Sequence, residues 1–349
     1  MKFGAIALLG LSACAGDDTD DKTSDSGTTP PGEQWTVIGN ADNLPAAALL
    51  SIWGKSDDMF VVGADDGAGP VVLHWDGAAW GRLDTGTTDD LWWVWSDGGD
   101  QVLIGGEGAR VVTYTRSTGA FSETVISTFP QYTIFGIWGS SPTDVWAVGG
   151  DVGNSLPGAI FHFDGTAWTQ AAEAPADPDG NRRQAFKVWG SAADDVWVIG
   201  TGALVMHWDG AAWTGLEQPL YGETPLTTVS GRAPNDVYAV GGFNNAAVAH
   251  WDGTAWTDDS PPPQAIAPNF NGVFASAQFG VVACGGNGSI YWRQDTGWEV
   301  DARPPATARD FHACWIDEAG AVWAVGGDLT NQTEGVVIYG GDTVAPVSL

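Results

Sequence analysis

The chain has 349 residues, of which 44% are hydrophobic and 20 are tryptophan, so it carries enough apolar surface for a large core and global disorder is excluded. Its formal net charge is −30, with 13 Lys and Arg against 43 Asp and Glu. A surface this acidic repels phosphate backbones and anionic headgroups, which argues against nucleic acid as a partner. The charge fits solubility outside the cytoplasm, or adaptation to salt or divalent cations.

Residues 1–13 have the pattern of a bacterial signal peptide. Lys2 gives a positive start, an apolar run from Phe3 to Leu11 follows, and the stretch ends in Leu11-Ser12-Ala13-Cys14. The apolar run is too short to span a bilayer as a helix. Its last four residues resemble the lipobox of bacterial lipoproteins. The resemblance implies acylation of Cys14, cleavage before it and anchoring by the attached lipid; the alternative is a secreted protein in which Cys14 is incidental.

Residues 14–33 are predicted to be an acidic, flexible tether. They are rich in Asp, Thr, Ser, Gly and Pro and lack aromatic residues, so they bury too little surface to offset the entropy of ordering. Ala15 rather than Asp follows the cysteine, which by the lipoprotein sorting rule implies the outer membrane. We therefore expect a cell-envelope protein anchored to the outer membrane, facing the periplasm or the cell surface.

From Trp35 onward the sequence repeats. In each unit a glycine follows an apolar run such as Asp144-Val145-Trp146-Ala147-Val148, and these glycines recur about 40 to 50 residues apart. They are Gly63, Gly105, Gly149, Gly200, Gly241, Gly285 and Gly326. Seven units, each with four alternating apolar runs, predict an all-β fold, a seven-bladed β-propeller of four-stranded antiparallel blades over residues 34–342. Residues 343–349 are expected to form a C-terminal tail.

Two features of the units predict local structure. Asp-Gly pairs between the third and fourth runs predict hairpins with type I′ turns; they are Asp76-Gly77, Asp164-Gly165, Asp209-Gly210 and Asp252-Gly253. The second unit, with Val112 to Arg116 and Phe121, and the sixth, with Phe274 to Ser276, depart from the consensus but keep the four runs. Both are therefore counted as blades.

The two ends of the repeat region predict how the ring closes. The seventh unit has three runs but no closing Trp strand after Gly341, whereas Gln34 to Val37 resembles an orphan copy of that strand. We expect this N-terminal strand to form the outer edge of the last blade, which removes an open edge. The alternative is that Trp35 ends a lost blade.

The repeat resembles that of bacterial extracytoplasmic seven-bladed propeller lipoproteins and, more distantly, of sialidase-type (BNR or Asp-box) and kelch propellers. The motif is Trp-Gly-Ser, as at Trp138, then Asp-Val-Trp-Ala-Val-Gly, then His-Trp-Asp-Gly-x-x-Trp, as at His207. It departs from the Asp-box because Asp209 and Gly210 are adjacent. Sialidase chemistry needs converging arginines and a nucleophilic Tyr, and no motif here matches that set. No catalytic residue is carried over from the resemblance.

Strand order predicts which loops share a face of the propeller. Loops between the second and third strands and links between blades emerge on one side, and these vary in length and chemistry. This loop-rich side is the predicted binding surface, unless the loops are spacers without a ligand. The candidate residues are Asp65, Asp66, Asp151, Asn154, Asp177, Asp179, Arg182, Arg183, Asn244, Asn245, Asp328 and Asn331.

Residues that could carry chemistry have mostly structural interpretations. Four histidines, His74, His162, His207 and His250, recur at one repeat position and are expected to be structural. Trp53, Trp95, Trp138, Trp189 and Trp315 share another position and are expected in the blade core. Cys284 and Cys314 occupy apolar slots, where they either form a disulfide between the last two blades or pack as small hydrophobes. Asp177 and Asp179 give a weak indication of a calcium loop; otherwise no metal site or cofactor is expected.

These observations predict a non-enzymatic binding or scaffold module. It would be a monomer, attached to the membrane through lipid on Cys14, that engages a protein or a glycan through its loop-rich face. The alternative is a glycan-active hydrolase or lyase at the axial mouth, which requires paired carboxylates facing the channel. Asp151, Asp310 and Asp328 are candidates that the sequence cannot pair.

Overall fold

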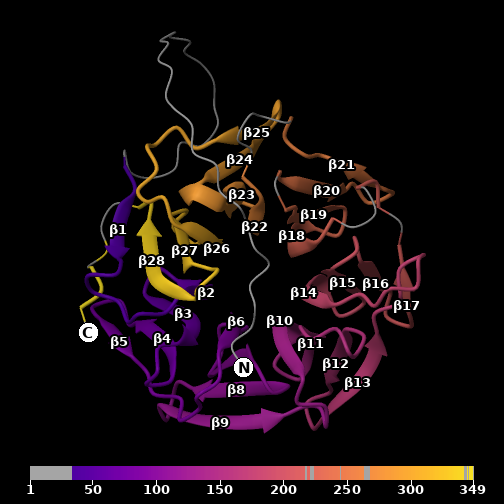
Figure 1. Cartoon of the computed structure of the whole chain (residues 1–349), viewed down its shortest axis with the longest axis horizontal. Coiled ribbons are helices and arrows are strands. Elements are labelled where there is room, and N and C mark those ends of the chain that lie inside the picture. The colour runs from indigo at the N-terminus through magenta and orange to yellow at the C-terminus, as the bar shows by residue number, and fades with distance from the viewer. Residues whose placement is uncertain are drawn as a thin grey trace.

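A computed structural model describes residues 34–216, 218–220, 224–243, 245–262, 268–341, 344 and 346–348. These residues form an all-β structure of seven four-stranded antiparallel sheets arranged in a ring (Figure 1). The predicted signal peptide, Cys14 and the tether lie outside the described residues. In the part of the chain that is described, no helix is long and apolar enough to cross a membrane.

Blades 1 to 4 follow one another along the chain. Their strands are β2 (Leu49–Lys55), β3 (Asp58–Asp65), β4 (Pro70–Trp75) and β5 (Trp80–Arg82) in blade 1; β6 (Leu91–Trp95), β7 (Gln101–Gly106), β8 (Arg110–Thr115) and β9 (Ala120–Val125) in blade 2; β10 (Tyr132–Ser141), β11 (Asp144–Asp151), β12 (Ala159–Phe163) and β13 (Trp168–Glu173) in blade 3; and β14 (Ala185–Ala192), β15 (Asp195–Gly200), β16 (Val205–Trp208) and β17 (Trp213–Gly215) in blade 4.

Blades 5 to 7 complete the ring, and the two divergent units of the sequence do form blades 2 and 6. The remaining elements are β18 (Leu226–Ala233), β19 (Asp236–Gly241), β20 (Ala247–Trp251) and β21 (Trp256–Asp258) in blade 5; β22 (Phe270–Ser276), β23 (Gly280–Gly285), the short 3-10 helix η1 (Gly286–Gly288), β24 (Ile290–Gln294) and β25 (Gly297–Val300) in blade 6; and β26 (Asp310–Ile316), β27 (Val322–Asp328), β28 (Thr333–Tyr339) and β1 (Thr36–Gly39) in blade 7.

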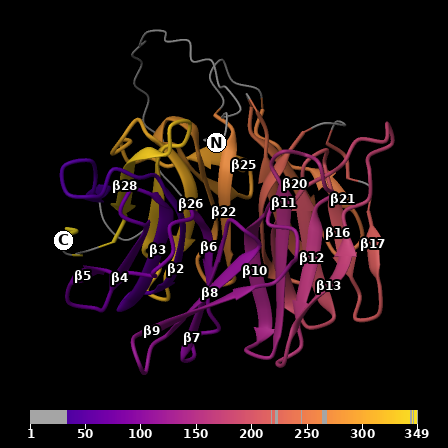
Figure 2. The same ribbon diagram turned by 60° about the horizontal axis from the view of Figure 1, so that its bottom comes forward.

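Within each of blades 1 to 6 the strands pair in chain order, from the inner strand at the axis to the outer edge (Figures 1 and 2). This order puts all the 2–3 loops and blade links on one side of the ring, called the loop face from here on. The 1–2 and 3–4 turns lie on the opposite side, the turn face. The division into two faces predicted from the sequence is therefore confirmed.

The ring closes through the N-terminal strand. β1 pairs antiparallel with β28, with Thr36 opposite Tyr339 and Val37 opposite Ile338, and so supplies the fourth strand of blade 7. The tail adds to this closure, because the Val347 N–H donates to the Ile38 carbonyl at 2.6 Å. The predicted closure is confirmed, and the tail packs on it.

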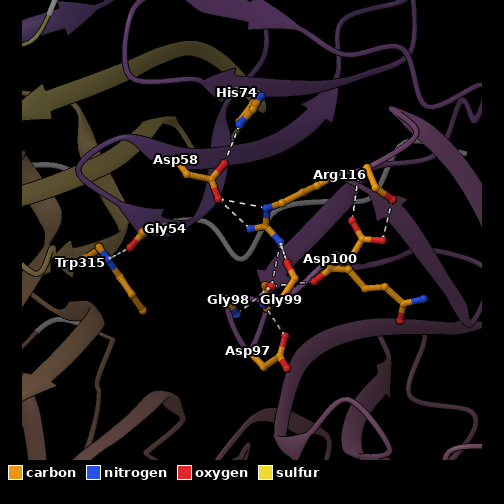
Figure 3. A network of polar contacts seen from close by, with 12 residues as sticks. Gly54, Asp58, His74, Asp97, Gly98, Gly99, Asp100, Arg116 and Trp315 are labelled. Carbon is orange, nitrogen blue, oxygen red and sulfur yellow. Dashed lines mark hydrogen bonds and ion pairs between the residues drawn. The ribbon is translucent and has the colours of Figure 1, made fainter.

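The four repeated histidines join neighbouring strands of their own blades. His162 of β12 bonds Asp144 at the start of β11 at 2.6 Å and stacks on Trp146 with ring centroids 4.2 Å apart. The same arrangement holds His74 to Asp58, at 2.7 Å, and this Asp58 also binds Arg116 of the next blade (Figure 3). The expected structural role is confirmed: these pairs fix the turn end of blades 1, 3, 4 and 5.

The Asp-Gly hairpins differ from the predicted turn type. In blade 1 the paired residues are Trp75 and Trp80, so the loop has four residues rather than two. Only Gly77 has positive φ (86°), whereas a type I′ turn needs two such residues. The Asp76 carboxylate accepts the N–H groups of Ala78 and Ala79, at 2.9 and 2.8 Å, and this closes the wider loop.

The closing strand generates a stability prediction. Ile38 is fully buried in the cluster formed by blades 7 and 1, whereas its neighbour Val37 is half-buried. We expect Ile38→Ala to lower the free energy of unfolding by about 2–4 kcal/mol and Val37→Ala by about 1 kcal/mol, measured by urea denaturation. Equal small effects at both positions would contradict a closure that depends on β1.

Candidate functional site

The predicted loop-face acids mostly stabilise their own loops. Asp65 accepts the N–H groups of Gly67 and Gly69, at 2.7 and 2.9 Å. Asp66 forms an ion pair with Arg82 at 2.7 Å, and the hydrogen bonds from this guanidinium hold the pKa of Asp66 below its usual value. These carboxylates are therefore already used by the loop between β3 and β4.

Blades 3 and 4 bring several of the predicted residues together. Asp151 is only 3% exposed and accepts the N–H groups of Gly153 and Leu156, at 2.8 and 2.9 Å. Gln184 donates to Asn154, at 2.8 Å, and Arg182 donates to the Asn154 carbonyl at 3.3 Å. Arg183 is adjacent, and its carbonyl accepts the Gly158 N–H at 2.8 Å. This group joins the 2–3 loop of blade 3 to the link that leads into blade 4.

The remaining predicted loop residues stay separate from that group. Asp177 accepts three hydrogen bonds, from the Asp179 N–H and from both the N–H and the side chain of Asn181, so both of its oxygens have donors. In the described residues no group of three or more His, Cys, Asp or Glu side chains could hold a metal ion. Asp328 binds Asn331 within its own loop at 2.8 Å. Asn245 is exposed, and Asn244 lies outside the described residues.

Exposed apolar side chains on the loop face were not predicted from the sequence. All the large hydrophobic residues that the structure records as exposed lie at this end of the molecule, in blade links, 2–3 loops or the last residue of an outer strand. They are Val125, Phe129, Val152, Phe243 and Val300, which are 46–63% exposed. Their signal in the sequence is weak, because most of them are single apolar residues between polar ones or glycine, in loops or at the last residue of a strand.

Three of these residues lie around the boundary between blades 2 and 3. Tyr132 joins two of the segments that carry them: its ring lies edge-on to Phe129 at 6.3 Å, and its hydroxyl donates to the carbonyl of Pro157, in the loop of Val152, at 2.9 Å. Val125 ends β9 just before this link, and Val152 begins the loop that contains Pro157. We call Val125, Phe129 and Val152 the loop-face patch.

An acidic group flanks blades 1 and 2 on the same face. Burial, together with the nearby Asp90 and Asp89 carboxylates, raises the pKa of Glu107 to about 7. Burial also raises the pKa of Asp90, whose carboxylate accepts the Asp65 N–H at 2.7 Å. Arg110 forms an ion pair with Asp89 and partly balances this charge.

Large side chains from the inner strands close the axis of the ring near the loop face. Trp92 of blade 2 contacts His312 of blade 7, with centroids 6.0 Å apart, although blade 1 lies between them in the ring. Phe135 lies edge-on to both Trp92, at 5.2 Å, and Phe186, at 5.4 Å. Because rings from non-adjacent blades meet here, we call these four residues the axial plug.

A buried lysine lies next to the plug. Lys187 of β14 is 4% exposed; its ammonium donates to the Phe135 carbonyl at 2.5 Å and lies 4.3 Å from the ring centroid of Trp93. Burial lowers the pKa of Lys187 to about 7, and burial with the nearby Lys187 charge lowers that of His312 to about 3. The sequence signal for this site is a lone lysine in an inner strand, between Phe186 and Val188.

On the turn-face side of the plug, the inner strands surround an axial cavity of about 260 Å³. Each blade contributes one residue from the position of the first repeated tryptophan, and we call this set the axial ring: Trp53, Trp95, Trp138, Trp189, Ser230, Phe274 and Trp315. The tryptophans are only partly buried. The five tryptophans pack against the hydrophobic clusters of the blades, as expected, and they also line the cavity, whereas Trp146, Trp197 and Trp323 are 0–3% exposed and lie fully inside the core.

The two cysteines of the propeller are free thiols. Cys284 of β23 and Cys314 of β26 are both buried, and Cys314 also lines the axial cavity. Burial raises the pKa of Cys284 well above its usual value, and its hydrogen bond with Cys314 acts in the same direction. Of the two arrangements that the sequence left open, the structure has the pair as neighbouring buried side chains without a bond.

Comparison with solved structures gives the same fold. The chain is similar to YCF48 from Cyanidioschyzon merolae (TM-score 0.66, 13% identity, 88% of this chain and 98% of that chain). It is also similar to virginiamycin B lyase from Staphylococcus aureus (0.67, 14%, 87% and 99%) and to the WD40 propeller domain of Doa1 (0.62, 9%, 88% and 98%). No protein-family model and no curated protein matches the chain. At these identities the likeness shows the propeller fold alone.

The buried amine generates a pH prediction. Because the pKa of Lys187 is about 7 in the folded protein and an exposed lysine has an ordinary value of 10.5, the unfolded chain binds more protons between these values, and stability rises with pH there. The cost of burying the charge is fully present below pH 7. We expect Lys187→Met to raise the free energy of unfolding at pH 6 by about 1–3 kcal/mol, and by less at pH 9.

The matched control is Lys55→Met, because Lys55 is exposed. It should leave the pH dependence of unfolding unchanged. The measurement is denaturant unfolding of both variants and the parent protein across this pH range. A Lys187→Met variant whose stability difference stays constant with pH would show that the amine is not the source of the pH dependence.

Proposed function

We propose that this protein is a lipid-anchored binding or scaffold module of the cell envelope, which engages a partner protein through its loop face. The observation that carries the proposal is the distribution of exposed large hydrophobic side chains. Among the described residues all of them lie on the loop face, and three form the loop-face patch. Apolar side chains gathered on one face of a rigid scaffold are typical of protein interaction sites.

The chemistry of the face favours a protein over a glycan. Phe129, Val152 and Phe243 are about half exposed, and the Asp151 carboxylate next to Val152 already binds backbone N–H groups of its own loop. A glycan needs free polar side chains that fix its hydroxyls, whereas a protein interface is built around apolar and aromatic anchors with a polar rim. The neighbouring Arg182 and Asn154 would belong to such a rim.

Membrane attachment is the second part of the proposal. It rests on the lipobox pattern that ends at Cys14 and on the acidic, Pro- and Ser-containing segment between Cys14 and the first strand. A segment of this length holds a propeller a few nanometres from the membrane, so the loop face can reach partners at the envelope.

A hydrolase or lyase remains the alternative, and the geometry favours binding instead. The residues that line the axial cavity include no Asp or Glu. The Asp310 carboxylate accepts the Asn287 N–H at 2.8 Å, and Asp151 and Asp328 are bound within their own loops. A glycosidase needs two carboxylates facing one bond, and these three do not form such a pair.

The anchor is tested by Cys14→Ser. We expect this variant to move from the membrane fraction to the soluble fraction after cell lysis, because the acyl chains have no attachment site. The Ala15→Ser variant next to it should stay in the membrane fraction. Labelling of the parent protein with a clickable fatty acid, absent from the Cys14→Ser variant, is the second measurement. Cys14→Ser protein that stays on membranes would contradict the anchor.

The loop face is tested by adding charge to it. We expect the double variant Phe129→Asp and Val152→Asp to lower cross-linking to the envelope partner about tenfold, because a desolvated carboxylate disrupts an apolar anchor. The control variant Ala78→Asp and Ala211→Asp adds the same charge on exposed turn-face loops and should cross-link normally. Equal loss in both variants would contradict the assignment, and binding to a glycan array in place of a protein would overturn the partner class.

A further inference from the structure

The geometry points to a second, small-molecule binding site: the axial cavity takes an organic cation with a quaternary ammonium head. This site lies on the axis and opens away from the axial plug, towards the turn face, so it is separate from the loop face of the proposed function. Its residues are the axial ring and the apolar side chains next to it in the inner strands, such as Ile52, Val94 and Val188. The volume of about 260 Å³ suits a small organic ion rather than a polymer.

Four tryptophans of the axial ring, Trp95, Trp138, Trp189 and Trp315, reach over the inner strand of the next blade. A Cβ atom placed on Gly190 would lie 2.6 Å from Cη2 of Trp138, and one on Gly231 would lie 2.5 Å from Cη2 of Trp189. The Trp315 indole N–H donates to the Gly54 carbonyl in the same way, at 2.8 Å (Figure 3). The long axes of the indoles therefore run around the channel, and glycine at the next position permits this close packing.

The angles between the rings show which way their faces point. Seven blades are related by steps of about 51° around the axis. Rings that lay flat across the channel would be nearly parallel, whereas rings that run around the channel and face the axis differ by one step. Trp53 and Trp315 of adjacent blades are inclined by 51°, and Phe274 and Trp315 by 42°. The cavity is therefore lined by aromatic rings that stand along the channel rather than lie across it.

Aromatic faces carry negative π charge and attract cations. Two cations of the protein already lie over indoles of the cavity lining: the Lys187 ammonium is 4.3 Å from the Trp93 centroid, and the Arg116 guanidinium carbon, at the end of the third strand of blade 2, is 5.7 Å from that of Trp53. The turn face adds long-range attraction, because most of its 1–2 turns carry carboxylates, for example Asp57, Asp97 and Asp194.

The polar groups of the lining select the type of cation. The Thr228 hydroxyl donates to the Asn271 carbonyl at 2.6 Å, and the Ser230 hydroxyl accepts the Ala275 N–H at 3.0 Å. The Thr228 proton and one Ser230 lone pair are thus already used within the protein, which leaves few polar groups in the lining for a ligand. A sugar or a primary amine would lose hydrogen bonds to water without replacing them. A quaternary ammonium has no hydrogen-bond donors, so it gives up no donated hydrogen bonds to water when it enters the cavity.

The test uses choline and its neutral isostere 3,3-dimethyl-1-butanol, with isothermal titration calorimetry on the purified protein. We expect choline to bind and the isostere, which has the same shape without charge, to bind at least about tenfold more weakly. Glucose is the sugar control and should give no heat of binding. Equal binding of choline and the isostere, tighter binding of glucose, or no binding of choline at millimolar concentration would each overturn the proposal.

A variant pair places the site. Trp138→Leu removes one aromatic face of the axial ring and should weaken choline about tenfold, whereas Trp168→Leu on the outer strand of the same blade should leave it unchanged. Thermal unfolding of both variants checks that they are folded. If Trp138→Leu fails to fold, the comparison of choline with its isostere on the parent protein still decides the proposal. Loss of choline binding in Trp168→Leu but not in Trp138→Leu would contradict the axial location.

Discussion

The pairing of β1 with β28 is the constraint on which the rest of the structure depends. Thr36 and Val37 lie opposite Tyr339 and Ile338, so the first and last strands of the propeller belong to one sheet. A ring of sheets that packs face to face has no free edge only when this blade is complete. Every feature on the axis needs residues from non-adjacent blades, and closure holds those blades at fixed positions. Burial of Ile38 and the contact of the tail with β1 also stabilise the pairing of β1 with β28.

All seven blades share one backbone arrangement. Side chains at equivalent positions are alike at the turn end of the blades and differ on the axis near the loop face. At the turn end, His–Asp pairs recur in four blades with nearly the same geometry. On the axis near the loop face, equivalent positions hold different residues, among them Trp92, Phe135 and His312. The first pattern stabilises each blade. The second fills a single space that all blades share, so its members must differ in size and shape.

The sequence predicted the architecture well because its signals are local and repeated. Strand alternation, the recurrent glycines and the orphan strand at Gln34 to Val37 each follow from short-range chemistry that the structure reproduces. The Asp-Gly turns show the limit of such reasoning, since Asp76 closes a four-residue loop by accepting two N–H groups and does not adopt positive φ. The Asp-Gly pair alone does not distinguish a two-residue type I′ turn from a four-residue loop closed by the Asp carboxylate.

The candidate sites were harder to predict because they arise from the closed ring. Trp138 and Trp146 are both tryptophans in apolar runs of one blade, yet one lines the axial cavity and the other is 3% exposed in the core. The inner strand has a bulge between Ile134 and Gly136, which changes which side chains face the axis. No pattern of residues in the sequence predicts this bulge. In the sequence, Lys187 is recognisable only as a charged residue in an apolar run. The sequence does not show that the Trp93 ring, two blades away, contacts it.

Charge and burial together explain how two different surfaces can coexist on this chain. The net charge of −30 keeps the outer surface hydrated, and many loop carboxylates are held by backbone N–H groups, as at Asp151 and Asp65. The apolar side chains of the loop-face patch are exposed on the same face, and Val152 is adjacent to one such carboxylate, Asp151. On the axis the balance is different, because aromatic rings line the cavity, and the Lys187 ammonium beside it lies over the Trp93 ring and has its pKa lowered to about 7 by burial. An acidic rim around an aromatic interior is the electrostatic arrangement that draws a cation inward and repels an anion.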